Sequence, residues 1–348
     1  MTTTSKADLL GLTLPQLQEV CGQLALPAFN AKQMAEWLYK KRATDIDQFS
    51  NLSLRTRAAL KEGYCIGRSK PVSCSTSSDG TRKYLFAVGE GRHIETVYIP
   101  DGERGTLCVS SQAGCRMACR FCATGMSGYH GNLTASQILN QILSVDEAES
   151  LTNIVFMGMG EPLDNLDAVL QATTALTADW GMAWSPRRIT VSTVGLAAPL
   201  KRFLAESQCH LAISLHSPFP DRRQAIMPAQ QRHPLAATLS LLREYNWRGQ
   251  RRLSFEYILF KGLNDDLMHA SALVKLLHGL PCRVNLIPFH PNAGAPQFQP
   301  SPQAAVSRFQ QYLTSHGMTA TLRTSRGQDI DAACGLLASK QNPSTDIS

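Results

Sequence analysis

Short apolar runs alternate with longer stretches of helical periodicity from about residue 105 onward. Six of these runs predict β-strands, because each is apolar and bounded by polar or turn residues: residues 107–110, 154–157, 189–192, 211–215, 253–259 and 284–287. The segments between them are long enough to hold the crossover helices that parallel strands require. The pattern therefore predicts an α/β fold in which a (βα)6 parallel sheet curls into an incomplete barrel.

Two smaller regions precede this barrel. Leucines at helical spacing, interspersed with Lys and Arg residues, predict a small helical domain of RNA-binding type over residues 1–70. The same basic residues could equally form an ordinary solvent-exposed face with no RNA contact. Residues 71–104 hold a Ser78-Asp79-Gly80 turn beside strand-like runs and predict a short β extension. The barrel then spans residues 105–336, and the polar tail, residues 337–348, is expected to be disordered.

Polar signatures follow four of the predicted strands: Gly158-Met159-Gly160-Glu161, Ser192-Thr193, Ser214-Leu215-His216 and Pro288-Phe289-His290. The carboxyl ends of parallel strands lie at one edge of a sheet, where α/β proteins bind ligands. Glycines let the backbone approach a ligand closely, and a glutamate can accept hydrogen bonds from an ammonium group. Taken alone, the glycine motif is also compatible with a turn that closes a βα loop.

Composition places the chain among globular proteins, with 348 residues of which 43% are hydrophobic and 18% charged. It has neither an apolar run that could span a membrane nor an N-terminal export signal, so we expect a cytoplasmic protein with no membrane partner. Its ten cysteines are then expected to be reduced, catalytic or metal-bound. The net charge of +7 permits a nucleic-acid partner without requiring one.

The strongest chemical signal is the C-x3-C-x2-C spacing of Cys115, Cys119 and Cys122. Three thiolates this close in sequence can bind one 4Fe-4S cube and leave its fourth iron free for a small molecule. Structural zinc usually takes four ligands, and no second cysteine pair lies nearby, yet zinc remains the alternative from spacing alone. The loop, with Phe121 before its last cysteine, resembles the cluster loop of radical S-adenosylmethionine (SAM) enzymes.

Further motifs extend this likeness over nearly the whole chain. They lie at residues 32–33, 36–39, 95–100, 108–112, 132–135, 158–163, 191–193, 214–216, 285–288 and 329–335. With them, the chain resembles the RlmN/Cfr family of radical-SAM RNA methyltransferases. The resemblance implies an enzyme that uses a 4Fe-4S cluster and SAM to add a methyl group to a ring carbon of adenine in RNA.

Two cysteines outside the cluster loop acquire roles from this resemblance. Cys334 matches the family's methyl-carrying cysteine, which one SAM methylates while a second SAM supplies a radical, so two are used per turnover. Cys108 matches the cysteine that releases the covalent product by forming a disulfide with Cys334. Glu95 matches the family's proton acceptor, a role that Cys108 could also fill. Spacing alone would leave both cysteines as small core residues.

The family pattern also indicates which residues contact SAM. They are Gly160, Glu161, Ser192, Ser214, Leu215 and His216, together with His290, which stands where the family usually has asparagine. A histidine can still make one hydrogen bond, but with a different reach and a titrating proton.

The expected substrate is 23S ribosomal RNA, with transfer RNA as a further substrate and C2 as the adenine carbon. Methylation of C8 or of another RNA is the first alternative, because Ala123-Thr124-Gly125 is closer to Cfr proteins. The second alternative is an RNA-binding protein whose iron-sulfur cluster stabilises the fold or senses redox state. The intact Cys108 and Cys334 motifs argue against it. We further expect a monomer and an electron donor such as flavodoxin.

Overall fold

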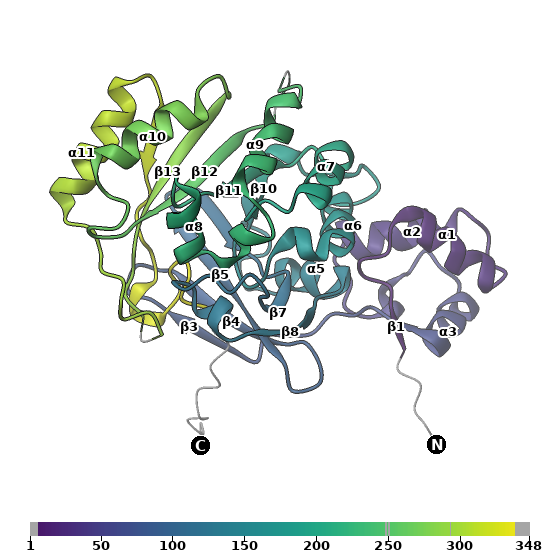
Figure 1. The fold of residues 1–348 in the computed structure, drawn as a ribbon. Coiled ribbons are helices and arrows are strands. Elements are labelled where there is room, and N and C mark those ends of the chain that lie inside the picture. Colours follow the sequence, from purple (N-terminus) through teal and green to yellow (C-terminus); the bar gives the residue numbers. More distant parts are fainter. Residues whose placement is uncertain (1–5, 248, 250, 293, 338–348) are drawn as a thin grey trace, which may run out of the picture.

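The computed structural model describes residues 6–247, 249, 251–292 and 294–337. Most of them form an α/β unit around one large sheet, and the N-terminal residues form a smaller lobe beside it (Figure 1). Within the described residues, no helix is long and apolar enough to cross a membrane. The tail expected to be disordered lies outside the described residues, apart from Leu337, which is buried.

The N-terminal lobe consists of short helices and a two-stranded parallel sheet, so its predicted helical character is confirmed. Its elements are β1 (Ala7–Asp8), α1 (Leu14–Gln23), α2 (Asn30–Ala35), α3 (Leu54–Gly63) and β2 (Tyr64–Cys65), with shorter turns at Glu36–Lys40 and Ile46–Gln48. A capping box formed by Thr13 and Gln16 starts α1. The Gln171 Nε2 donates to Gln16 Oε1 (2.9 Å) and attaches the lobe to α6 (Leu166–Thr177) of the barrel.

Ten strands form the large sheet in the order β14-β13-β12-β11-β10-β9-β6-β5-β4-β3. Their bounds are β3 (Ser73–Thr76), β4 (Arg82–Ala87), β5 (His93–Asp101), β6 (Arg104–Cys108), β9 (Asn153–Phe156), β10 (Ile189–Thr193), β11 (His210–Ser214), β12 (Leu253–Leu259), β13 (Cys282–Pro288) and β14 (Thr319–Leu322). The seven strands from β14 to β6 are parallel. The edge strands β14 and β3 are not neighbours, so the barrel is incomplete, as predicted.

All six predicted parallel strands are present, as β6 and β9 to β13. The seventh, β14, was not predicted because it has no buried residue and therefore no apolar signal. The predicted β extension forms β3, β4 and β5, which continue the sheet past β6 as antiparallel strands. This region is thus part of the barrel sheet, and β5 forms a wall next to the first parallel strand.

Helices cover the outer face of the parallel strands (Figure 1). In addition to α6 they are α5 (Ala135–Leu143), α7 (Ala197–Glu206), α9 (Leu235–Glu244), α10 (Leu267–Leu277) and α11 (Gln303–Ser315). The short helix α8 (Pro220–Ile226) lies instead at the carboxyl ends of β10 and β11. The central strand β12 is buried at all seven positions, as expected for a parallel strand covered on both faces. Shorter turns of 3-10 helix lie at Pro162–Asn165, Pro186–Arg188, Pro228–Gln231 and Gln328–Ile330.

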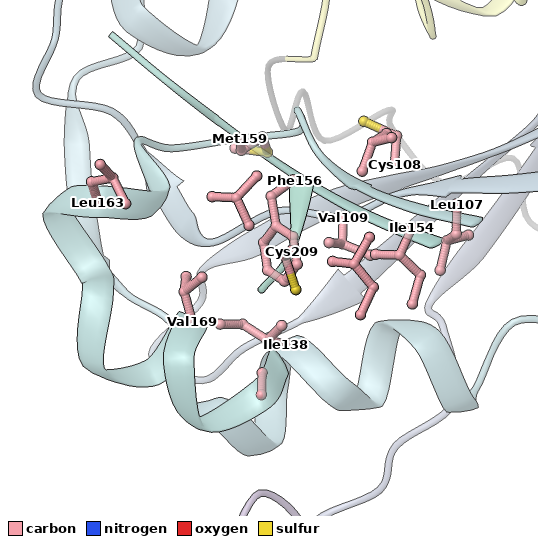
Figure 2. Packing of buried hydrophobic residues seen from close by; sticks show 14 of the residues in the cluster. Leu107, Cys108, Val109, Ile138, Ile154, Phe156, Met159, Leu163, Val169 and Cys209 are labelled. Carbon is pink, nitrogen blue, oxygen red and sulfur yellow. The ribbon is translucent and has the colours of Figure 1, made fainter. Parts of the chain in front are cut away.

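The core lies between the sheet and these helices. Figure 2 shows Leu107 and Ile154 of the strands close to Ile138 of α5 and Val169 of α6, all fully buried. Side chains alternate along a strand, so Cys108 points to the opposite face from Leu107, into the barrel. The same apolar pattern that builds the core therefore aims every second residue at the interior, where the site lies.

Candidate active site

The cysteine loop and the strand-end motifs meet in one cavity of about 150 Å³ at the carboxyl ends of the parallel strands. We call it the loop cavity. Its walls include Cys115, Cys119, Cys122, Gly160, Glu161, Ser192, Ser214, His216, Glu256 and Cys334. Nearly all of the predicted cluster and SAM residues therefore come together, although they lie on four separate segments of the chain.

The cysteine loop connects β7 (Gln112–Gly114), which pairs with β8 (Tyr129–Asn132), to the short helix α4 (Ala123–Met126). Gly114 has a φ of +74°, and a Cβ there would lie 1.9 Å from the carbonyl oxygen of Gly128, so only glycine fits. The next residue, Cys115, donates its N–H to that oxygen (2.8 Å). The Cys122 N–H donates to the Cys119 carbonyl (3.1 Å). These bonds close the loop and turn its thiols toward the cavity.

The chemistry of this donor set fits an iron-sulfur cube. Burial raises the pKa of the Cys115 thiol to about 12 and also raises the pKa values of Cys119 and Cys122, so the metal-free thiols are neutral and bind iron with loss of protons. Among the described residues, no three His, Cys, Asp or Glu side chains are arranged around a single metal ion. Thiolates on a cube bind different irons, so they need not converge on one point.

Glu161 is held by two backbone amides from different loops. Its Oε1 accepts from the Leu163 N–H (3.0 Å) and its Oε2 from the Val194 N–H (2.9 Å). Burial raises the pKa of this carboxyl to about 7, and the hydrogen bonds oppose the rise. A carboxylate in this position favours a cationic partner, because an ammonium group would compensate the buried charge.

Gly160 brings the backbone close to β7. It has a φ of +100°, and an added Cβ would lie 2.5 Å from the Cβ of Gln112. The Glu161 N–H donates to Gln112 Oε1 (2.9 Å), and Gln112 Nε2 donates to Asp164 (2.8 Å). Gln112 thus joins the glycine motif to the start of the cysteine loop.

The Ser214-Leu215-His216 motif lies at the carboxyl end of β11, where Ser214 and His216 form part of the wall of the loop cavity. His216 has a φ of +56°, and its Nδ1 accepts from the Ile258 N–H (3.0 Å), which leaves Nε2 as the protonated nitrogen. Burial, followed by the charge of Arg223, lowers the pKa of His216 to about 3, so the ring is neutral. Leu215 is fully buried, lies outside the lining of the cavity and donates its N–H to the Glu256 carbonyl (3.0 Å).

Cys334 also lines a second cavity of about 390 Å³, together with Cys108, and we call this the dithiol cavity. Its walls come from β5, β6 and β9 on one side and from β13, β14 and the C-terminal segment on the other. Cys334 is exposed to both cavities, whereas Cys108 is buried at the end of β6. The predicted methyl carrier therefore stands between the cluster loop and the predicted resolving cysteine.

Arg323 is the charged group beside these two thiols. Its guanidinium hydrogen-bonds Cys334, and its charge acts on Cys108 as well. The enclosing cavity walls raise the pKa of the Cys334 thiol, and Arg323 opposes this. Burial raises the pKa of Cys108 to about 12. Arg323 therefore partly offsets the cost of forming a thiolate at Cys334, the more accessible of the two sulfurs.

Glu95 lies on β5 two residues before Val97, and Val97 pairs with Cys108 of β6. The side chains of Glu95 and Cys108 are therefore on the same face of the sheet. Its carboxylate forms an ion pair with Lys83 (3.2 Å). Glu95 is not among the lining residues of either cavity.

His290 lines the dithiol cavity and not the loop cavity. Its Nε2 hydrogen-bonds the hydroxyl of Ser325, and burial lowers its pKa. Of the residues predicted to contact SAM, Leu215 and His290 are the two that the structure does not place in the loop cavity.

The sequence did not indicate Glu256 and Arg323, which line these cavities, or Arg223, which supports the loops around them. Arg223 is 1% exposed and donates to the carbonyls of Val194 (2.8 Å) and Ser214 (2.9 Å), so it fixes two loops of the site. Glu256 and Arg323 face the interior of the barrel. No local motif marks any of them. The alternation of β12 into the barrel is the one signal that could have indicated Glu256.

Two protein families match parts of the chain. Residues 7–66 match the ribosomal RNA large subunit methyltransferase N-terminal domain, and residues 109–273 match the radical SAM superfamily. A crystal structure of a radical SAM methyltransferase from Sphaerobacter thermophilus is 41% identical and superposes with a TM-score of 0.89, covering 95% of this chain and 99% of that one.

Named relatives match over nearly their full length. A Porphyromonas gingivalis protein named "Probable dual-specificity RNA methyltransferase RlmN" is 54% identical over 99% of this chain and 97% of its own. The "Dual-specificity RNA methyltransferase RlmN" of Halorhodospira halophila is 41% identical over 95% of this chain and 93% of its own. This chain therefore belongs to the RlmN family of radical-SAM RNA methyltransferases, enzymes that use SAM and an iron-sulfur cluster.

Proposed function

We propose that this enzyme methylates C2 of an adenine in 23S ribosomal RNA and in transfer RNA, through a methyl group carried on Cys334. The observation that carries the proposal is the placement of Cys334, which lines both the loop cavity and the dithiol cavity. A residue in this position can face SAM on one side and a nucleobase on the other. The relatives are named dual-specificity RNA methyltransferases, and this supports two RNA substrates.

The cysteines and the predicted SAM contacts that line the loop cavity each have a part in this scheme. Cys115, Cys119 and Cys122 would hold the 4Fe-4S cluster, and when bound it would supply the electron for reductive cleavage of SAM to methionine and a 5′-deoxyadenosyl radical. The carboxylate of Glu161 accepts from the ammonium group of SAM, and Gly160 leaves room for it. Ser192, Ser214 and His216 supply polar atoms along the same walls.

Cys334 first takes a methyl group from one SAM, because its thiolate lone pair attacks the methyl carbon of the sulfonium. Arg323 favours that thiolate. The S-methyl group then gives a hydrogen atom to the radical from a second SAM. The resulting methylene radical adds to the adenine carbon, so two SAM molecules are consumed per turnover.

Cys108 releases the product. After the ring hydrogen has left as a proton and one electron has returned to the oxidised cluster that Cys115, Cys119 and Cys122 would hold, Cys334 is joined to the base by a closed-shell methylene bridge. The Cys108 thiolate attacks the Cys334 sulfur, the Sγ–CH2 bond breaks, and its electron pair stays on carbon, which takes up a proton. The Cys108–Cys334 disulfide needs two electrons before the next turnover. Glu95, on the same face of the sheet as Cys108, accepts the ring proton.

The dithiol cavity is the site proposed for the target adenine. Its volume lies in the usual range for small ligands. Arg104, Arg323 and Arg326 in its walls match the negative charge of an RNA strand. A cytoplasmic monomer that receives electrons from a flavodoxin-type protein completes the proposal.

The decisive experiment uses SAM with a fully deuterated methyl group. The anaerobic, cluster-loaded enzyme, with its Cys334 freed of pre-bound methyl, is incubated with ribosomal and transfer RNA, and the nucleosides are analysed by mass spectrometry. The expected product is 2-methyladenosine that keeps two deuterium atoms, because the radical removes one and solvent supplies a hydrogen. Cys334→Ala should give no product, and the control Cys74→Ala, at an exposed cysteine outside both cavities, should be active.

Three deuterium atoms in the product would exclude the Cys334 route, because direct transfer keeps the whole methyl group. Product that matches 8-methyladenosine would move the target to C8. Methylation restricted to one of the two RNAs would remove the other from the proposal.

A further inference from the structure

A third cavity, of about 380 Å³, lies at the opposite end of the barrel from the cysteine loop, and we call it the basic cavity. Its walls come from the amino ends of the neighbouring strands β6 and β9 to β13. Arg104 begins β6, Arg187 precedes β10, His210 begins β11, Arg252 precedes β12 and Arg283 is the second residue of β13. Five strand starts thus place basic side chains around one opening.

These positive charges are not neutralised by neighbouring carboxylates. The arginine ion pairs of the described residues involve Arg82, Arg92, Arg116, Arg202 and Arg326, none of which lines this cavity. Burial, followed by the charges of the surrounding arginines, lowers the pKa of His210 to about 4. The neighbouring charge of Arg252 likewise contributes to lowering the pKa of Arg283, after burial. The cavity therefore holds excess positive charge.

Glu256 is the acidic residue among the described lining residues, and it lies at the inner end, where it also borders the loop cavity. Its Oε1 accepts from Ser254 (2.9 Å) and Asn285 (2.7 Å), and its charge acts on Arg323. The outer rim of the basic cavity is formed by Arg187, Arg252 and Arg283, whose positive charges are available to bind an anion.

We propose that the basic cavity binds phosphate groups. Several guanidinium forks around one opening match the geometry of phosphate oxygens. Arg104 and Arg323 line both this cavity and the dithiol cavity, so the two are contiguous. That continuity favours phosphates of the RNA strand beside the target adenosine, a source that rests on the proposed function. A free phosphate compound has the same chemistry and is the other source.

The test compares Arg252→Gln/Arg283→Gln with a control that loses the same charge elsewhere, Arg222→Gln/Arg308→Gln. Both control arginines are exposed and lie outside the three cavities. Pyrophosphate binding is measured by calorimetry, and binding of a single-stranded RNA oligonucleotide by fluorescence anisotropy over a range of salt concentrations. Equal thermal unfolding midpoints establish that both variants fold.

We expect the cavity variant to bind pyrophosphate about tenfold or more weakly than the control. If RNA phosphates are the source, RNA affinity also falls, and the slope of log affinity against log salt becomes shallower by about 1.4, since each lost contact removes about 0.7. If a free compound is the source, pyrophosphate binding falls while RNA binding equals that of the control. Equal binding of both probes by the two variants would overturn the proposal. Methylation is not measured, so failure of the proposed reaction would not affect this result.

Discussion

Replacing Arg223 by methionine should destabilise the fold around the active site. Arg223 lies on α8 and is 1% exposed, and its guanidinium donates to the carbonyls of Val194, Ser214 and Leu215 and to the side chain of Gln230. The three carbonyls lie at the carboxyl ends of β10 and β11, next to Ser192, Ser214 and His216 in the wall of the loop cavity. Methionine keeps most of the volume and removes every one of these bonds.

The magnitude follows from two opposing terms. Hydrogen bonds from a charged donor contribute about 1.5–3 kcal/mol each, so losing four would cost about 6–12 kcal/mol if they were additive. The variant also avoids burying a charge. Burial lowers the pKa of Arg223 to about 10, which corresponds to about 3 kcal/mol. Leu215 O and Gln230 Oε1 keep the donors Ser217 N–H and Leu235 N–H, so the loss is further reduced. We expect a net destabilisation of about 3–5 kcal/mol.

For a chain of this length, such a loss lowers the thermal unfolding midpoint by about 4–7 °C. The assay is differential scanning calorimetry of the metal-free protein under reducing conditions. The matched control is Arg222→Met on the same helix, where the side chain is exposed and the expected change is within about 0.5 kcal/mol. If Arg223→Met melts at the same temperature as Arg222→Met, the argument that this buried guanidinium holds the two loops is wrong.

Three further predictions concern the site. The ring resonances of His216 should show no titration between pH 7.5 and 5, because the pKa of the folded residue is lowered to about 3. In the unfolded chain this histidine binds a proton below about pH 6.5, so the free energy of unfolding should fall by up to about 1.4 kcal/mol per pH unit as the pH drops from there toward 3. An NMR titration midpoint near 6.5 in the folded protein would contradict this. Cys108→Ala should accumulate protein joined to RNA through Cys334, detectable as a nucleotide adduct on the digested peptide, and normal turnover without adduct would remove Cys108 from the mechanism. His290→Ala should leave SAM affinity unchanged and alter RNA selectivity, because His290 lines the dithiol cavity and not the loop cavity, whereas SAM binding that is about threefold to tenfold weaker would make His290 a SAM contact as the family pattern predicts.

The parallel strands and the chemistry of the cysteine loop could both be predicted from local patterns in the amino-acid sequence. The strand β12 could be predicted because burial on both faces requires an unbroken apolar run, which is a local signal. The spacing of Cys115, Cys119 and Cys122 within one loop is equally local, and Gly160 beside Glu161 marks a close backbone approach. The resemblance to a family then assigned roles to Cys108 and Cys334, which no spacing rule could single out.

Which distant residues meet could not be predicted in this way, because it depends on how the whole chain folds. β14 has no buried residue, so its sequence shows no alternation of apolar residues that would predict a strand. It is a strand because it forms hydrogen bonds with β13. In the sequence, nothing distinguishes Arg223 from an exposed arginine on a helix. The folded chain buries it against the carbonyls at the ends of β10 and β11. The arginines of the basic cavity are separated by tens of residues and gather because parallel strands start at the same end of a sheet. Local apolar periodicity specifies helices and strands, because it depends on residues that are near one another in the chain. Contacts between charged residues across the barrel depend on the order and direction of the strands.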